Sequence, residues 1–398
     1  MLGLSRRALG IAPSATLSID ARAKELRAQG MDVVGFGAGE PDFDTPEYIR
    51  EAAKRAIDEG KTRYTPVAGT LSLRKKIAEK FLRDNGLSYT PDQILVSSGA
   101  KQSLFNAFSV LLNEGDEVLI PQPYWVSYPE MVKMVGGVPV FVATPAEEGF
   151  RFTAKTLEPF VTARTKALIL NSPNNPNGFA LSRDALEGIA RLAVEKQFYV
   201  VSDEIYEKLI YDGEEHVSIA SLGEDIYAQT IVVNGVSKTY AMTGWRIGYA
   251  AGPKEIIKRM SAFQSHASSN ANSIAQYATE AALSGGEDYL AEMVREFDAR
   301  RTLLYDLVAA APGLSANLPK GAFYMMVNVK SAFGKSHGGK LIQSSTDFAA
   351  LLLEEKHVAV VPGEAFGEPG HVRLSYATSR ERIQEGIRRM AEFMGELQ

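Results

Sequence analysis

Short apolar runs alternate with stretches of helical periodicity between residues 94 and 250, and this alternation limits the possible folds more than any other feature. Apolar, β-rich runs lie at 94–96, 117–120, 139–143, 167–170, 199–201, 230–233 and 247–250. Helical periodicity lies between several of them, at 101–112, 128–134 and 183–196. Alternating strands and helices are typical of a mainly parallel sheet with helices on both faces. We therefore expect an α/β fold whose large domain is built in this way.

The pattern changes on both sides of this region. Before it, the sequence predicts a helix at 17–29, a strand at 33–36 and two helices that flank a loop at 63–66. After it, the predicted elements are a long amphipathic helix at 287–310, strands at 322–329, 357–361 and 371–376, and helices at 345–355 and 381–397. We expect a large domain over 46–286 and a smaller, discontinuous α+β domain formed by 15–45 and 287–398. Residues 1–14 are predicted to form an N-terminal arm, and 335–340 a flexible surface loop.

Composition limits the partners and the compartment. The 398 residues carry a net charge of −5, which gives no indication of a nucleic-acid or anionic-membrane partner. The chain has no cysteine, which excludes disulfides and thiolate metal sites and fits a reducing cytoplasm. No apolar run approaches the ~20 residues that a membrane span needs. Ser5-Arg6-Arg7 is similar to a twin-arginine export signal, but the apolar stretch after it is too short, so we expect a cytoplasmic protein.

Lys238 stands in the most informative motif. It follows the apolar run at 230–233, directly after Ser237, and Gly244-Trp245-Arg246-Ile247-Gly248 comes shortly after it. A lysine beyond a buried strand is usually a surface residue whose charge reaches water. Here the hydroxyl of Ser237 and the guanidinium of Arg246 suit a phosphate dianion. A desolvated lysine beside a cation has a lowered pKa and can form a Schiff base with a carbonyl compound.

Two further apolar runs also end in polar groups. Asp203 and Tyr206 follow the run at 199–201, and Asn175 follows the run at 167–170. Asp203 could be a helix cap or part of a surface ion pair, and the segment around Asn175 could be only a turn. A carboxylate that ends an apolar strand is costly to bury without a cationic partner, however, and it could keep a pyridine nitrogen protonated. Open α/β sheets bind ligands at this edge, and a lysine, an acid, a phenol, an amide and an arginine there are what pyridoxal phosphate needs.

Other segments add candidate ligand contacts. Gly99, Ala100 and Lys101 follow the strand at 94–96 and open a helix, where backbone N–H groups can bind an anion. Trp125 is either a core residue or a plate stacked on a ring. Arg373 stands between valine and leucine in a predicted strand, and its planar guanidinium can bind a carboxylate with two hydrogen bonds.

Taken together, these motifs resemble those of aspartate aminotransferases of the fold type I pyridoxal-phosphate family, and the resemblance covers nearly the whole chain. The resemblance is greatest to the bacterial branch with a lysine in the phosphate loop. It implies an aminotransferase-like fold, pyridoxal 5′-phosphate as cofactor, and a homodimer with shared active sites. The implied reaction converts L-aspartate and 2-oxoglutarate to oxaloacetate and L-glutamate. A prephenate, aromatic or broad-range aminotransferase of the same family is the alternative.

The resemblance also implies a role for each candidate residue. Lys238 holds the cofactor and acts as base, Asp203 pairs with the pyridine nitrogen, and Tyr206 and Asn175 contact the cofactor's phenolate oxygen. The phosphate is held by Gly99, Ala100, Lys101, Ser237 and Arg246, and by Tyr64 from the neighbouring subunit. Trp125 stacks on the cofactor ring, and substrate contacts come from Gly39, Lys101, Trp125, Asn175 and Arg373. Lys101 is expected to bind the acidic side chain of the substrate.

Alternatives from other classes are a nicotinamide-dependent oxidoreductase and a non-catalytic regulator. Gly35, Gly37 and Gly39 have the spacing of a dinucleotide fingerprint, but Glu-Pro-Asp follows them where a helix is required. A regulator of this class would have a helix-turn-helix extension before the domain, and none is predicted. The five histidines lack metal-ligand spacing, so we expect no metal site.

Overall fold

The structure is a computed structural model, and it describes residues 3–12 and 15–398. The predicted N-terminal arm, 1–14, therefore lies partly outside the described residues. The described helices are α1 (Arg6–Leu9), α2 (Ala15–Ala28), α3 (Glu47–Asp58), α4 (Leu71–Asn85), α5 (Ala100–Leu111), α6 (Ser127–Met134), α7 (Ala154–Leu157), α8 (Arg183–Lys196), α9 (Glu224–Gln229), α10 (Lys254–Ala267), α11 (Ser273–Ala282), α12 (Glu287–Ala310), α13 (Ser345–Lys356) and α14 (Arg380–Glu396).

The described strands are β1 (Val34–Gly35), β2 (Ile94–Ser97), β3 (Glu117–Pro121), β4 (Val138–Val142), β5 (Thr165–Asn171), β6 (Tyr199–Asp203), β7 (Thr230–Gly235), β8 (Gly248–Ala251), β9 (Ser315–Ala316), β10 (Tyr324–Asn328), β11 (Ser336–His337), β12 (Lys340–Leu341), β13 (Val358–Ala359), β14 (Val361–Pro362) and β15 (His371–Ser375). All the strands expected between 94 and 250 are present.

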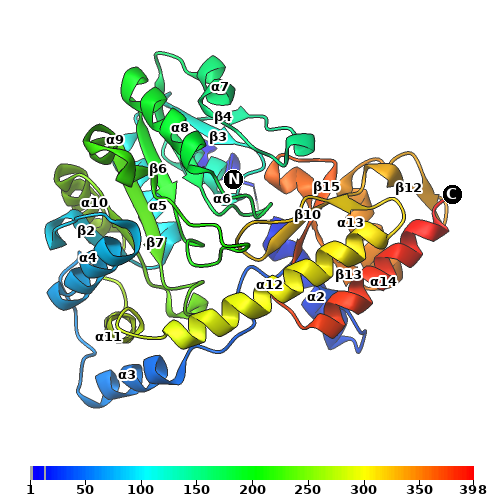
Figure 1. The fold of residues 1–398 in the computed structure, drawn as a ribbon, viewed down its shortest axis with the longest axis horizontal. Coiled ribbons are helices and arrows are strands. Elements are labelled where there is room, and N and C mark those ends of the chain that lie inside the picture. The colour runs from blue at the N-terminus through cyan, green and yellow to red at the C-terminus, as the bar shows by residue number, and fades with distance from the viewer. Residues whose placement is uncertain (1–2, 13–14) are drawn as a thin grey trace.

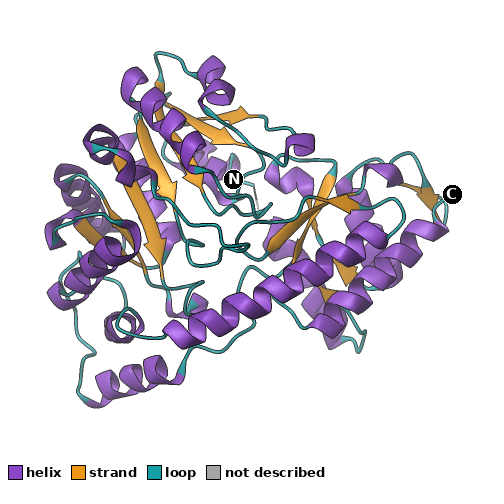
Figure 2. Ribbon diagram, in the orientation of Figure 1, coloured by secondary structure: helices purple, strands orange, loops and turns teal. Residues whose placement is uncertain are grey.

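A seven-stranded sheet forms the larger part of the molecule, in the order β2-β8-β7-β6-β5-β3-β4. Its strands are parallel except β8, which pairs antiparallel with both β2 and β7. Helices cover both faces (Figure 2). Neighbouring residues of one strand serve opposite faces: Leu168 and Leu170 pack against α8, whereas Ile169 packs in the cluster that includes α5 and α10. Strands buried on both faces read as continuous apolar runs, which is why the sequence predicted them. The expected α/β class with a mostly parallel sheet is confirmed.

A second, four-stranded antiparallel sheet lies on the other side of the molecule, in the order β14-β15-β10-β9. The helix α12 runs from beside α11 to this sheet, where it packs with α14 (Figure 1). The strand predicted at 357–361 is in fact two: β13 pairs with β1, and β14 joins the four-stranded sheet. The loop predicted at 335–340 is also wrong, because β11 and β12 form a hairpin around Gly338 and Gly339, which both have positive φ. The predicted domain boundaries remain predictions.

Among the described residues, no helix has the length and apolar character that crossing a membrane requires.

Candidate active site

A cavity of about 500 Å³ opens at the carboxyl ends of β5, β6 and β7. Strand register explains how the polar residues come together, since Asn171 is paired with Asp203 at the ends of two parallel strands. Ser237 and Lys238 follow the end of the next strand, β7. The predicted site residues that line this cavity are Gly39, Ala100, Lys101, Trp125, Asn175, Asp203, Tyr206, Ser237, Lys238, Arg246 and Arg373.

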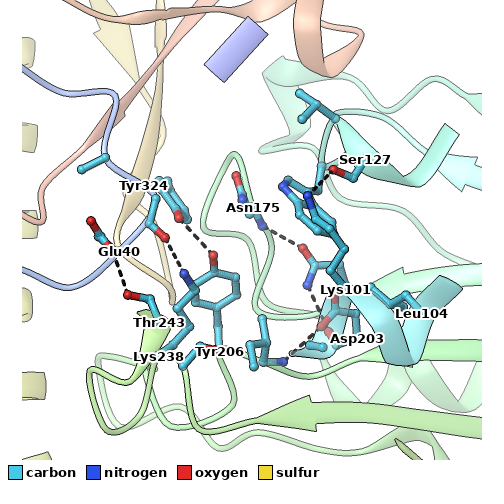
Figure 3. Close-up of a pocket in the computed structure, with 18 of the residues that line it drawn as sticks. Glu40, Lys101, Leu104, Ser127, Asn175, Asp203, Tyr206, Lys238, Thr243 and Tyr324 are labelled. Atoms are coloured by element: carbon cyan, nitrogen blue, oxygen red, sulfur yellow. Dashed lines mark hydrogen bonds between the residues drawn. The ribbon is translucent and has the colours of Figure 1, made fainter. Parts of the chain in front are cut away.

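Lys238 points into the cavity from the turn after β7 (Figure 3). Its Nζ donates a hydrogen bond to the carbonyl oxygen of Gly39 and lies 5.9 Å from the ring centroid of Tyr206. Burial lowers the pKa of Lys238 to about 8; Glu40 opposes this shift and Arg246 adds to it. Much more of its amine is therefore in the neutral form, which acts as nucleophile or base, than in a lysine with the ordinary pKa at the same pH.

Asp203 ends β6 and is buried. Its Oδ2 accepts a hydrogen bond of 2.7 Å from the hydroxyl of Tyr128, and its Oδ1 accepts one of 3.3 Å from the backbone of Ile205. Burial raises the pKa of Asp203 to about 6, although the hydrogen bond from Tyr128 lowers it. The carboxylate can therefore accept a proton or hold a cationic N–H group that enters the cavity.

Arg373 stands on β15, lines the same cavity and is only 1 % exposed. Its Nη1 donates to Oδ1 of Asn175 and its Nη2 to the carbonyl oxygen of Gly37, each at 3.0 Å. The guanidinium lies 4.4 Å from the ring centroid of Tyr324. Its Nε is buried without a partner in the described part of the chain. An unpaired buried donor is costly, and a carboxylate in the cavity would satisfy it.

The start of α5 and the turn before β8 form a compact wall at one end of the cavity. Gly99, just before α5, has φ of 85°, and a Cβ atom there would lie 2.4 Å from Nη2 of Arg246. A Cβ atom on Gly248 would lie 2.1 Å from the backbone nitrogen of Ala100. Glycine is thus required for the guanidinium and the helix N-terminus to approach each other. A cation, the Ser237 hydroxyl and the first N–H groups of α5 together suit a phosphate dianion.

Lys101 and Trp125 lie on the side of the cavity opposite Lys238. The Nζ of Lys101 lies 4.6 Å from the ring centroid of Trp125 and donates a hydrogen bond of 3.1 Å to Oγ of Ser127 (Figure 3). Burial lowers the pKa of Lys101, and the cation of Arg246 acts in the same direction. This end of the cavity therefore presents a positive charge beside an aromatic face.

Tyr64 is the predicted residue that lies away from the cavity of its own chain. It stands in the loop between α3 and α4, where it is 91 % exposed. Gly99 does not line the cavity either, but it forms the wall behind Arg246.

Several cavity residues were missed by the sequence reasoning. Tyr128 bonds Asp203, and the hydroxyl of Tyr324 lies 3.0 Å from that of Tyr206. Oγ1 of Thr243 donates a hydrogen bond of 2.7 Å to Glu40, which joins the turn after β7 to the loop after β1 (Figure 3). None of these residues has a local signal, because each meets its partner only after distant segments pack. Further lining residues that were not predicted are Lys24, Gly37, Ala38, Leu104, Val126, Ser127, Asn171 and Ile205.

His216 is not isolated, contrary to what its sequence spacing indicated. Its ring, Glu204 and Glu207 have possible ligand atoms within 4.8 Å of one another, and the two glutamates follow the end of β6. These groups have protein partners: Lys80 forms an ion pair with Glu207, and Ser218 donates a hydrogen bond of 2.7 Å to Glu204. We interpret the cluster as a buried ion-pair network.

The chain is similar to known proteins along nearly its whole length. The profile of the family described as "Aminotransferase class I and II" matches residues 31–390. The aspartate aminotransferase of Bacillus sp. (strain YM-2) is 49% identical over 391 residues, 98% of this chain and 99% of that protein. The aspartate/prephenate aminotransferase of Thermus thermophilus is 50% identical over 398 residues, 99% of this chain and 100% of that protein. The crystal structure of the aspartate aminotransferase from Rhizobium meliloti has a TM-score of 0.96, 45% identity and 100% coverage of both chains, which confirms the expected aminotransferase-like fold.

Proposed function

Because this chain belongs to the class I and II aminotransferase family, as its motifs predicted, we propose that it transfers the amino group of L-aspartate to 2-oxoglutarate. The products are oxaloacetate and L-glutamate. One observation carries this proposal: Lys238 with a lowered pKa, the buried Asp203 and the buried Arg373 all face one cavity. These are the base, the ring partner and the carboxylate clamp that the resemblance requires.

The cavity residues fit pyridoxal 5′-phosphate, the cofactor of this family. The wall formed by Gly99, Ala100, Ser237 and Arg246 suits its phosphate, since glycine there leaves room for the guanidinium beside the helix N-terminus. When bound, this cofactor supplies an aldehyde that combines with amino groups and a ring that accepts the electrons released at Cα. Asp203 would hold the ring nitrogen's proton, Tyr206 and Asn175 would contact the phenolate oxygen, and Trp125 would stack on the ring.

Lys238 has two roles in the proposed mechanism. In the resting enzyme its Nζ would hold the aldehyde carbon of the cofactor covalently. Its free amine would act as the base that removes the Cα proton of the bound substrate. Its lowered pKa supports this role, because the amine loses its proton at a lower pH than a lysine with an ordinary pKa does.

Arg373 binds the α-carboxylate of the substrate with two hydrogen bonds, helped by the backbone amide of Gly39. The unpaired Nε of Arg373 supports this role, since this residue lines the cavity and has a buried donor without a partner in the described part of the chain. Because Arg373 holds the carboxylate, this group cannot turn into the orientation from which carbon dioxide would leave. Deprotonation at Cα is therefore favoured over decarboxylation. Asn175, which accepts a hydrogen bond from Arg373, keeps the guanidinium in place.

Lys101 is proposed to bind the second carboxylate of aspartate or 2-oxoglutarate. All three similar proteins described above carry aspartate in their names, and one also carries prephenate. Prephenate and aromatic substrates are the alternative, supported by the aromatic face of Trp125 beside Lys101. A long, flexible lysine can meet an acidic side chain or move away from a bulkier one.

We further propose a cytoplasmic homodimer with shared active sites. Tyr64 is almost fully exposed in the single chain, as a residue that reaches a neighbouring subunit would be. In the dimer its phenol contacts the phosphate bound by the other subunit. The absence of cysteine supports a reducing compartment.

The test is a substrate panel with purified enzyme and added pyridoxal phosphate. Among donors we expect the highest kcat/KM for aspartate and glutamate, and a lower but measurable value for phenylalanine. Among acceptors we expect the highest values for 2-oxoglutarate and oxaloacetate, and a lower but measurable value for prephenate. A preference for neutral or aromatic substrates would favour the alternative. Absence of transamination with every donor, despite bound cofactor, would overturn the proposal.

A further inference from the structure

Gln264 lies outside the cavity, near the end of α10, and is 0 % exposed. Its Nε2 donates to the carbonyl oxygens of Val67 and Val96, at 3.1 and 2.9 Å. Its Oε1 accepts from Oγ of Ser97 and Nδ2 of Asn106, at 2.7 and 2.8 Å. A side-chain amide has two N–H donors and one oxygen with two lone pairs, so this one is fully used.

Three of these partners lie in the strand and the helix that flank the turn we assign to the cofactor phosphate. Val96 and Ser97 end β2, which leads through Gly99 into α5, and Asn106 stands on α5 itself. Gln264 therefore ties the strand to the helix on either side of the turn that holds the phosphate. The turn is fixed a second time by Gln102, whose Oε1 accepts a hydrogen bond of 2.6 Å from the backbone of Ser98.

The fourth partner belongs to the loop that carries Tyr64. Val67 is three residues beyond Tyr64, and the next residue, Ala68, accepts a hydrogen bond of 3.1 Å from the backbone of Val96. The same loop is held farther along by Gln276, which is also fully buried. Gln276 donates to Oγ1 of Thr65 at 3.0 Å and accepts from the backbone of Thr70 at 2.9 Å.

We propose that Gln264 is a positioning residue for two cofactor sites at once. It fixes the phosphate-binding turn of its own subunit, and it fixes the Tyr64 loop that serves the neighbouring subunit. The inference rests on the proposed function, namely a homodimer in which Tyr64 enters the other site. A fully bonded buried amide cannot follow a displaced partner without leaving another buried group unpaired, so the turn and the loop hold each other in place.

Mixed dimers separate the two effects. One chain carries Lys238→Ala and the other keeps Lys238, and two different affinity tags isolate the mixed species. Borohydride reduction attaches the cofactor to Lys238 only, so the labelled fraction at each pyridoxal phosphate concentration gives the affinity of one site without any turnover. That site combines the phosphate-binding turn of the Lys238 chain with Tyr64 of the other chain.

Gln264→Met should weaken cofactor affinity about tenfold when placed on either chain, because both elements depend on its hydrogen bonds. Two matched variants should each weaken cofactor affinity from one chain only. Ser97→Ala removes a hydrogen bond at the turn, so it should weaken affinity only when it is placed on the Lys238 chain. Gln276 contacts the loop and not the turn, so Gln276→Met should weaken affinity only when it is placed on the Lys238→Ala chain. Gln264→Asn, whose shorter amide cannot reach both sides, serves if the methionine variant does not fold.

Tyr64→Phe on the Lys238→Ala chain is the reference. If Tyr64→Phe weakens affinity from that chain, the shared site stands. If Gln264→Met then weakens affinity from one chain only, or from neither, the inference about Gln264 is wrong. If Tyr64→Phe has no effect from that chain, the shared-site proposal fails and the inference fails with it.

Discussion

The hydroxyl of Tyr128 donates a hydrogen bond of 2.7 Å to Oδ2 of Asp203, and both side chains are buried beside the cavity. The ring of Tyr128 is held in turn by an edge contact with Trp125, at 5.2 Å between ring centroids. The other oxygen of Asp203 accepts a long backbone hydrogen bond of 3.3 Å from Ile205. Tyr128 therefore fixes the orientation of this carboxylate and, by bonding its charged form, lowers its pKa.

Tyr128→Phe should weaken cofactor binding more at pH 6.5 than at pH 8.5. Burial already holds the pKa of Asp203 near 6, and loss of the hydroxyl moves it higher. At pH 6.5 the variant would then carry a protonated Asp203, which cannot hold the ring nitrogen by charge, whereas at pH 8.5 both proteins carry the carboxylate. We expect a loss of about 1.5–3 kcal/mol at the lower pH, the usual value of a hydrogen bond to a charged group.

The measurement is a titration of the apoenzyme with pyridoxal phosphate at both pH values. Tyr124→Phe is the control, because Tyr124 stacks on Phe141 and does not line the cavity. An equal loss at the two pH values would indicate that Tyr128 acts through packing and not through the charge of Asp203.

Capture of the cofactor by Lys238 should depend on pH with a midpoint near 8. The amine reacts only when neutral, and burial lowers its pKa to about 8, so the neutral form dominates above that value and is lost below it. Mixing the apoenzyme with pyridoxal phosphate between pH 6.5 and 10 should show a rate of visible-band formation that levels off above pH 9. A rate still rising at pH 10 would show an ordinary lysine pKa. Lys238→Ala should bind the cofactor without forming the band, and borohydride should label no other lysine.

Asp203→Asn should leave the fold intact and slow deprotonation by about two orders of magnitude or more, as loss of a preorganised charge at a reacting centre does. An amide has nearly the same shape but no charge to keep the ring nitrogen protonated. Single-turnover kinetics with aspartate provides the measurement, and the thermal transition of the variant checks folding. Single-turnover rates equal to those of the parent would make Asp203 a structural residue.

The large sheet could be predicted from the sequence because each of its strands is visible in a short, continuous segment of the chain. Each strand buried on both faces is a continuous apolar run, and the residues after Leu170, Val201 and Val233 have to meet where parallel strands end. The antiparallel direction of β8 could not be predicted, since an apolar run reads the same in both directions. The division of 357–361 between two sheets was also hidden, because Val360 is as apolar as its neighbours.

The cavity could be predicted only where a residue stands at the end of a strand or the start of a helix. Tyr128 and Tyr324 lie 75 and 118 positions from the residues that they bond. Their positions depend on how α6 packs on the large sheet and on where the four-stranded sheet places β10, and periodicity does not specify either arrangement. The ion pair between Lys80 of α4 and Glu207, in the turn after β6, has no sequence signal either, because the two segments meet only in the folded chain.

Lys80→Met should lower the free energy of unfolding by about 3–5 kcal/mol, because it leaves Glu207 buried without its cation. Although burial acts to raise it, Lys80 holds the pKa of Glu207 at about 2, well below its usual value. The stabilisation from Glu207 is therefore complete above about pH 4.5 and lost as pH falls toward 2. Urea unfolding at pH 7 measures the first effect, and a series of unfolding curves from pH 7 down to about pH 2 measures the second. Lys76→Met, on the same helix but in an exposed pair with Glu79, should cost under about 1 kcal/mol. Equal losses for the two variants would contradict the buried-pair assignment.

Lys101→Ser should lower kcat/KM for aspartate and leave that for phenylalanine nearly unchanged. The ammonium of Lys101 is held beside Trp125 and Ser127 at the side of the cavity opposite Lys238, where a second carboxylate of the substrate would lie. Loss of one charge-assisted hydrogen bond corresponds to about 1.5–3 kcal/mol, or roughly tenfold to a hundredfold in kcat/KM. Lys101→Arg, which keeps the charge, is the control and should retain most of the preference for dicarboxylates. Steady-state kinetics with both donors, at saturating cofactor, separates the two proposed roles of this lysine. Equal losses for aspartate and phenylalanine would assign Lys101 to the phosphate or to the fold, and the substrate preference would then require another cation.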